Sequence, residues 1–357
     1  MTPDGILELR LRNQGLDRAA FRKPEDVVSW FGAVQAQDYL GALWALGQRA
    51  RAATEASVEA AETRRAIVRT WPMRGTLHFV AAADVRWMSR LLAPRVLARN
   101  SARFERDFGV DARLIRRARE IVAGELEGGK RLERTELYAK LDARRIRTAG
   151  SRGLHVLLWL AMEGTICLAG RQGKQHTFAL LDEWIPASKP LDRDAALAEL
   201  ARRYFTSHGP ATPRDLMWWA GITAKDARAA IDSVKGELTS SCVDGTDYWW
   251  RESHGRRRAP REPVVRLLPS FDEYTVAYQD RSLLAPAQWS GHGVLGPVVV
   301  IDGRVVGDWR RTLSDGKSKR PGVTVRTRWR RKLSPAELAA LAAAMDDYAR
   351  FLGREPP

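Results

Sequence analysis

The segment WFGAVQAQDY, residues 30–39, contains two glutamines one residue apart, Gln35 and Gln37. An amide is neither an acid nor a base at neutral pH, so the pair offers hydrogen-bond acceptors and dipoles. Residues two apart face different ways on a helix, whereas they share a side in an extended segment. The two amides can therefore point together only if the helical pattern breaks near Val34. Otherwise they would cap a helix end or face solvent.

Other groups that could do chemistry are fewer and less specific. Asp272 and Glu273 in SFDEY could be a paired-carboxylate site, or they could form salt bridges near a basic strand. His155 lies in the apolar pattern LHVLLWL, which favours a hydrogen-bonded core histidine over a proton carrier. Arg74 and His78 in RGTLH fit the edge of a β-wing better than a catalytic role.

The sequence gives no sign of a metal or an organic cofactor. Its only cysteines, Cys167 and Cys242, are too few for a disulfide framework or a zinc site. The six histidines are scattered and show no metal-ligand spacing. We therefore expect chemistry without metal or cofactor.

Charge indicates the kind of partner. Among 357 residues, 59 are Lys or Arg and 43 are Asp or Glu, giving a net charge of +16. Such an excess, mostly arginine, favours a polyanion such as nucleic acid, although a high-GC coding bias would also raise arginine. No apolar run reaches the length of a membrane span, and the polar first residues do not fit a secretory signal. We expect a cytoplasmic protein.

Hydrophobic periodicity predicts an α+β fold of three tandem winged-helix modules followed by a β-rich domain and a closing helix. In each module, helical patterns precede a hairpin, with turns expected at Gly75, Gly173 and Asp244-Gly245. Later turns are expected at Asp302-Gly303 and Asp315-Gly316. The predicted boundaries are 1–100, 101–190 and 191–255 for the modules and 263–357 for the β-rich domain, with HGRRRAPREP as a linker.

Cations concentrate in the last domain. From Arg304 to Lys332 there are eleven Lys or Arg and two acidic residues, a local net charge of +9. VRTRWRR places alternate arginines on one strand face, and LSDGKSKRPG, residues 313–322, is a basic stretch between two strands. This pattern favours a nucleic-acid contact over a solvated hairpin. The expected DNA-binding residues are Arg310, Arg311, Lys317, Lys319, Arg320, Arg326, Arg328 and Arg330.

Four segments in order, AVQAQDYLGALWALGQR, RGTLHFV, HGPATPRDLMWWAGI and LLPSFDEYTVAYQDRS, resemble the AlkZ-like winged-helix DNA glycosylases. The resemblance implies a monomer that wraps around duplex DNA and excises N7-alkylguanine. In antibiotic producers, such enzymes remove bulky adducts or unhook crosslinks made by the host's own genotoxin. The family signature, Gln-apolar-Gln, corresponds here to Gln35-Ala36-Gln37. A sister branch has Asp in place of the second glutamine.

The resemblance gives the amides a role. Alkylation at N7 makes guanine cationic and a good leaving group, so an enzyme must stabilise the charge developing on the sugar and hold a water near C1′. Amide oxygens can do both without a tuned pKa. No lysine is placed as a Schiff-base nucleophile, which favours monofunctional hydrolysis. Whether the base is flipped out of the duplex stays open.

Two other functions fit the modules. A DNA-binding regulator would be a dimer on a palindromic site, and Gln35 and Gln37 would be dispensable. A damage binder would shield lesions without catalysis. Steeply salt-dependent but sequence-indifferent binding would disfavour the regulator, because only a regulator needs base-edge readout.

Overall fold

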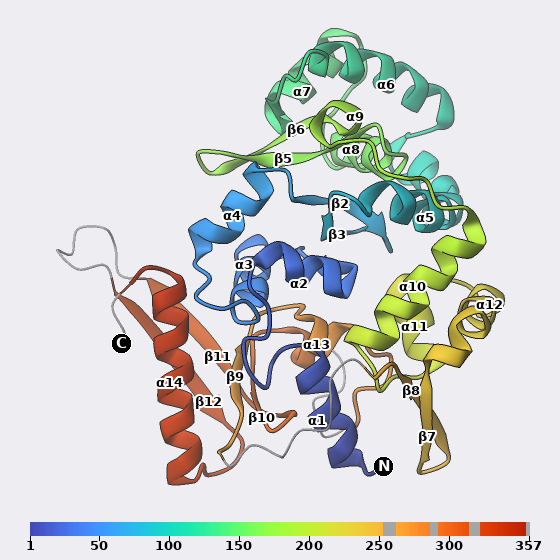
Figure 1. The fold of residues 1–357 in the computed structure, drawn as a ribbon. Helices are drawn as coiled ribbons and strands as arrows, with labels where there is room; N and C mark the ends of the chain where they lie inside the picture. The colour runs from blue at the N-terminus through green and yellow to red at the C-terminus, as the bar shows by residue number, and fades with distance from the viewer. Residues whose placement is uncertain (253–261, 286–291, 314–321, 355–357) are drawn as a thin grey trace. The chain divides into compact units, whose positions relative to one another are not determined.

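The structure is a computed structural model that describes residues 1–252, 262–285, 292–313 and 322–354. The chain forms two compact units (Figure 1). Unit 1 contains residues 1–58, 198–219 and 223–357, and unit 2 contains residues 59–197 and 220–222.

Unit 1 is built from helices and a separate four-stranded sheet. Its elements are α1 (Pro3–Asn13), α2 (Pro24–Phe31), β1 (Ala33–Gln35), α3 (Tyr39–Gly47), α11 (Pro213–Ala220), α12 (Ala224–Val234), η1 (Lys235–Glu237), β7 (Thr239–Val243), β8 (Thr246–Trp250), β9 (Val265–Leu268), α13 (Glu273–Val276), η3 (His292–Leu295), β10 (Val298–Ile301), β11 (Arg304–Leu313), β12 (Val323–Trp329) and α14 (Pro335–Phe351).

Unit 2 is formed by the middle of the chain. Its main segment begins within α4 (Glu55–Thr63) and ends within α10 (Arg193–Ser207). Its elements are β2 (Ile67–Met73), β3 (Thr76–Ala81), α5 (Val85–Phe108), α6 (Ala112–Leu126), β4 (Leu132–Glu133), α7 (Arg134–Ala143), α8 (Arg152–Met162), β5 (Ile166–Gln172), β6 (Gln175–Leu180) and α9 (Leu181–Trp184).

The predicted hairpins are present, and their turns explain their sequences. Asp244-Gly245 between β7 and β8 has φ values of 49° and 75°, and Asp302-Gly303 between β10 and β11 has 49° and 85°. Two successive positive φ values match the twist of the flanking strands and favour Asp-Gly. Gly75 and Gly173 also have positive φ, in the turns of β2–β3 and β5–β6. The turn expected at Asp315-Gly316 lies outside the described residues.

Within unit 2, five strands are ordered β3-β2-β5-β6-β4. Helices α5 and α8 pack on β2, and α6 and α7 pack on each other. Apolar positions at helical spacing on α6 and α8 face the same core as Trp71 of β2 and Phe178 of β6. The two hairpins of this unit are therefore anchored by helices on a common core.

In unit 1, a four-stranded antiparallel sheet is ordered β12-β11-β10-β9, and α14 runs along it (Figure 1). Helix α14 begins with a capping box between Ser334 and Glu337, and its Tyr348 and Phe351 contact Trp44 of α3 with ring-centroid distances of 4.9 and 5.1 Å. These aromatic contacts tie the closing helix to the helix that follows the two glutamines.

Within the predicted β-rich domain, the segment VVRLLPSFDEYTVAY, residues 264–278, alternates as a strand would, but only its first part forms one. Strand β9 ends at Leu268, just before Pro269, which lacks a backbone N–H for a sheet. The chain then forms the short helix α13, because the Asp272 carboxylate accepts the N–H of Tyr274 and caps its start. Capping here overrides the β propensity of Tyr, Thr and Val.

The fold is α+β, as predicted. Helices followed by a hairpin recur along the chain, ending in β2–β3, β5–β6 and β7–β8. The predicted boundary after residue 100 falls inside α5, and the segment 1–100 is divided between the two compact units. The assignment of three winged-helix modules with those boundaries stays a prediction.

Candidate functional site

The two glutamines lie outside any helix, in the junction between α2 and α3 of unit 1. Helix α2 ends at Phe31, and Gly32 follows with a φ of 82°, a conformation that glycine adopts at no steric cost. Strand β1 then runs to Gln35, and α3 begins after the cap residue Asp38. The non-helical junction predicted around Gln35 and Gln37 is confirmed.

The glutamines differ in burial. Gln35 is 7% exposed, whereas Gln37 is exposed. The junction thus combines one glutamine that is buried in unit 1 with one that is accessible to a macromolecule in solution.

Glu273 supports the junction from the interior. Its Oε1 accepts the backbone N–H of Gln35 at 2.7 Å, although 238 positions separate the two residues. Its Oε2 accepts the indole N–H of Trp219 at 2.9 Å and lies 3.2 Å from Nε2 of His208. Glu273 is 1% exposed, so its carboxylate is satisfied by protein donors.

Asp272 has a different partner from Glu273. Its two oxygens accept both terminal nitrogens of Arg49 at 2.7 and 2.8 Å, and neither side chain is more than 2% exposed. Arg49 also donates to two oxygens of Gln14 and to the carbonyl of Ala45. Asp272 thus forms a buried ion pair, in agreement with the salt-bridge alternative, and it lies at the start of a helix.

His208 is fully buried between Tyr204 and Glu273. Its ring stacks on Tyr204 at a centroid distance of 4.8 Å, and its Nδ1 lies 2.8 Å from the hydroxyl of Ser207. Burial lowers the pKa of His208 below its usual value, while the hydrogen bond to Glu273 opposes that shift. The Ser207 hydroxyl also lies 2.7 Å from the carbonyl oxygen of Arg203 and has one proton to donate. When it donates to Nδ1, a neutral imidazole donates to Glu273 from Nε2.

The arginines predicted on β12 alternate as expected. Arg326 and Arg328 are exposed, while Val325 and Thr327 are partly buried. Arg326 lies directly opposite Arg310 of β11. Like charges directly opposite on a sheet are destabilising, so this pair has a cost that a bound polyanion would remove.

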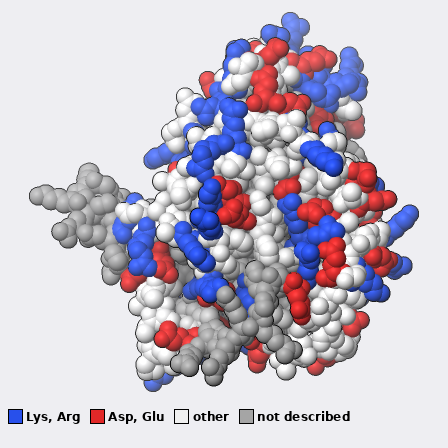
Figure 2. Space-filling view, viewed as in Figure 1, with Lys and Arg blue, Asp and Glu red and all other residues white. Residues whose placement is uncertain are grey.

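The other residues predicted to bind DNA do not share one face of the sheet. Arg328 forms an ion pair with Asp308 at 2.8 Å, and Arg330 is exposed just after β12. Arg311 points to the opposite face from Arg310 and donates to the hydroxyl of Tyr348. Lys317, Lys319 and Arg320 lie outside the described residues. On the face shown in Figure 2, cationic side chains are interleaved with acidic ones.

A pocket of about 300 Å³ lies beside Asp38, where the junction ends, and beside the basic sheet. Asp38, which follows Gln37, lines it together with Trp44, Trp309, Arg310 and Arg311. The neighbouring Leu40 is 36% exposed and also lines the pocket. Gln35 and Gln37 do not line this pocket, which brings only Asp38, the residue after them, next to the predicted DNA-binding residues Arg310 and Arg311.

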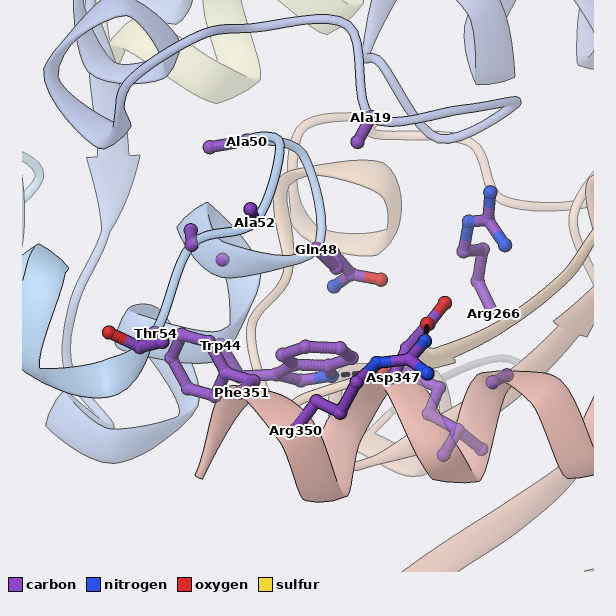
Figure 3. Close-up of a pocket in the computed structure, with 14 residues that line it drawn as sticks. Ala19, Trp44, Gln48, Ala50, Ala52, Thr54, Arg266, Asp347, Arg350 and Phe351 are labelled. Atoms are coloured by element: carbon purple, nitrogen blue, oxygen red, sulfur yellow. Dashed lines mark hydrogen bonds and ion pairs between the residues drawn. The ribbon is translucent and has the colours of Figure 1, made fainter. Parts of the chain in front are cut away.

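A second pocket of unit 1, of about 450 Å³, lies at the other end of α3 (Figure 3). Gln48 points into it, and Trp44, which lines both pockets, forms part of its wall. Arg266 in this pocket already donates to the backbone carbonyls of Asp17 and Val265. None of the predicted site residues lines this pocket.

The other candidates from the sequence are structural. His78 is fully buried on β3, where its Nδ1 donates to Thr76 O at 2.9 Å and its Nε2 accepts from Arg74 at 3.2 Å. His155 donates to Ser151 O at 2.7 Å and stacks on Phe108 at 3.7 Å. His78 lies on a hairpin strand, as expected, whereas His155 is hydrogen-bonded but only partly buried.

Sequence reasoning missed two residues around the junction. His208 and Trp219 lie far from Gln35 in sequence, and both contact Glu273. Trp219 is fully buried, while its neighbour Trp218 is 42% exposed and donates to Val276 O. The sequence signal that could have indicated them is that the ring N–H of a buried histidine or tryptophan needs a hydrogen-bond acceptor.

Two kinds of site are absent from the described residues. These residues contain no group of three or more His, Cys, Asp or Glu that could hold a metal ion. They also contain no helix long and apolar enough to cross a membrane.

A DNA glycosylase family matches most of the chain. The family described as DNA glycosylase AlkZ-like matches residues 28–351, which include the glutamine junction, Glu273 and the basic strands. The chain belongs to the AlkZ-like DNA glycosylase family, and the resemblance seen in the sequence is confirmed. It is a DNA glycosylase.

Two comparisons with proteins of Streptomyces sahachiroi agree. A curated relative described as an interstrand DNA cross-link repair glycosylase is 29% identical over 325 residues, covering 85% of this chain and 86% of the relative. The solved structure of the DNA glycosylase AlkZ aligns with a TM-score of 0.79 at 26% identity, covering 100% of this chain and 98% of that one.

Proposed function

We propose that this enzyme hydrolyses the N-glycosidic bond of N7-alkylguanine in duplex DNA, with Gln35 and Gln37 as the catalytic residues. The observation that carries the proposal is the non-helical junction that presents both glutamines in a chain of this glycosylase family. Hydrolysis breaks the bond between guanine N9 and C1′, whose electron pair leaves with the base; water adds its oxygen to C1′ and releases one proton to solvent.

The chemistry suits amides because the substrate is already activated. N7-alkylguanine is cationic, so it leaves as a neutral base without a protein acid. As the bond breaks, positive charge develops on the sugar, and amide oxygens stabilise it while holding the attacking water. No lysine nucleophile is needed, so the product is an intact abasic site rather than a cleaved strand.

The substrate range includes bulky adducts and crosslinks in this proposal. Support comes from the relative named as an interstrand DNA cross-link repair glycosylase. The pocket of about 300 Å³ beside Asp38, with aromatic walls from Trp44 and Trp309, supports room for a substituent near the junction. A producer of a DNA-alkylating antibiotic would gain self-resistance from such an activity.

DNA contact in this proposal comes from the basic strands β11 and β12 and from the winged-helix modules. The opposed Arg310 and Arg326 are the strongest structural support, because a phosphate between them would relieve their repulsion. Lys317, Lys319 and Arg320 would extend the contact along a groove. The enzyme acts as a cytoplasmic monomer, without metal or cofactor.

The test is excision from duplex oligonucleotides that carry one N7-methylguanine or one bulky N7-guanine adduct. Abasic sites are detected by strand cleavage in hot alkali, and an unmodified duplex is the control. We expect alkali-dependent cleavage at the adduct alone and no borohydride-trapped enzyme–DNA complex. Absence of excision from every adduct, with tight binding to one undamaged sequence, would instead support a regulator.

A further inference from the structure

The carboxylate of Glu273 is the feature of unit 1 that the proposed chemistry leaves unused. It touches the main chain of the candidate catalytic junction at Gln35 N–H, and it is 1% exposed. A buried backbone N–H needs an acceptor, but a neutral carbonyl would satisfy it. Burying a carboxylate there costs free energy unless its own hydrogen bonds are complete.

The donors around Glu273 offset that cost and fix its position. Trp219 donates to Oε2 at 2.9 Å, and His208 lies 3.2 Å from the same oxygen. When the Ser207 hydroxyl donates to Nδ1 of the imidazole rather than to the carbonyl oxygen of Arg203, Nε2–H faces Glu273. The ionised form of Glu273 makes the bond to Gln35 charge-assisted, and the length of 2.7 Å agrees with that class of bond.

The backbone that presents Glu273 is also held firmly. Phe271 has a φ of 60°, which costs free energy for a residue with a side chain and persists only where neighbours enforce it. Asp272 caps α13 and is clamped by Arg49. Trp218 donates to Val276 O at the other end of α13. Glu273 is thus the first residue of a helix fixed at both ends.

We propose that Glu273 is a positioning residue for the glutamine pair: its carboxylate, oriented by Trp219 and His208, holds the junction main chain at Gln35 so that both amides keep their reactive arrangement. This inference rests on the proposed function, because it assigns the network a role in that reaction. Glu273 does not touch substrate, and it acts through the backbone of Gln35.

The central test is Glu273→Gln in the full-length protein. This substitution keeps the shape of the side chain but replaces one acceptor oxygen by an amide nitrogen that cannot accept. We expect the single-turnover excision rate to fall by on the order of 100-fold, as for a small misplacement of catalytic groups. Affinity for the adduct duplex should stay within about twofold, because no DNA contact is removed.

Two further variants separate positioning from folding. Glu62→Gln alters another buried glutamate, in unit 2, and should leave the excision rate unchanged. Trp219→Phe keeps the packing but removes one donor to Glu273, and should lower the rate by less than Glu273→Gln does. It provides a test if Glu273→Gln does not fold.

The backbone bond can be measured without any reaction. In protein labelled with [15N]glutamine, the Gln35 amide proton should resonate far downfield, and it should shift upfield in Glu273→Gln and in Trp219→Phe. Wild-type excision rates in a folded Glu273→Gln protein, or an unmoved Gln35 resonance, would overturn the positioning role. Wild-type protein that excises nothing would instead overturn the proposed function, and the same assay would show it.

Discussion

At the scale of single residues, the two members of the glutamine pair have unequal environments. Gln35 is held from the interior through its backbone, whereas Gln37 is exposed one step further along. The backbone of Gln35 thus fixes the geometry of the junction, and Gln37 is the more accessible of the two amides. Asp38 then ends the junction by capping α3 through the N–H of Gly41.

The buried ion pair of Arg49 and Asp272 leads to a stability prediction. Arg49→Met should destabilise unit 1 by about 3–5 kcal/mol, because it leaves the Asp272 carboxylate buried and unpaired. The matched control is Arg328→Met, whose partner Asp308 is near the surface and whose loss should cost at most about 1 kcal/mol. Urea unfolding measures both. Equal costs for the two variants would contradict a structural role for the buried pair.

Local chemistry made part of the site predictable. A helix cannot aim residues 35 and 37 at one point, so the pattern required a break, and Gly32 supplies one. The contacts of Glu273 with Gln35, His208 and Trp219 could not be predicted, since sequence separations of 238, 65 and 54 positions carry no local signal.

At the scale of elements, the hairpins followed the sequence closely. Asp-Gly turns and period-two alternation are local rules, and they placed β7–β8 and β10–β11 correctly. The pattern failed after Leu268, where a proline and an aspartate cap converted an expected strand into α13. Local capping by Asp272 determined that this segment is a helix. Pro269 and Asp272 were the sequence features that indicated the end of the strand and the start of the helix.

The strand pair β11–β12 leads to a prediction about DNA affinity. Arg326→Ala should weaken binding to undamaged duplex and reduce the slope of log affinity against log salt by about 1, as for one lost phosphate contact. Arg328→Ala changes the net charge equally, but Asp308 already neutralises Arg328, so the slope should change less.

Fluorescence anisotropy over a salt series measures both slopes. Removing Arg326 should also leave stability unchanged or raise it slightly, because the repulsion with Arg310 disappears. Identical slopes for the two variants would show that only net charge matters, and would argue against a specific contact at Arg326.

At the scale of the whole molecule, charge and fold agree with the enzyme class. The net charge of +16 favours association with duplex DNA of any sequence, as a lesion search requires. Residues from three parts of unit 1, 1–58, 198–219 and 223–357, build the junction and its support. The periodicity of the chain gave the α+β class and the order of its elements, but division into compact units depends on long-range packing that periodicity does not encode.

The measurement that tests the central claim most directly is single-turnover excision of N7-methylguanine by Gln35→Ala and Gln37→Ala beside wild type, with duplex affinity measured on the same proteins. Each substitution should lower the rate by about 10²–10³-fold, the usual effect of removing one group that stabilises transition-state charge. Affinity should change little. Gln48→Ala, which alters a glutamine at the other end of α3, should behave as wild type. Excision at wild-type rates in both junction variants would contradict the assignment of catalysis to the two amides.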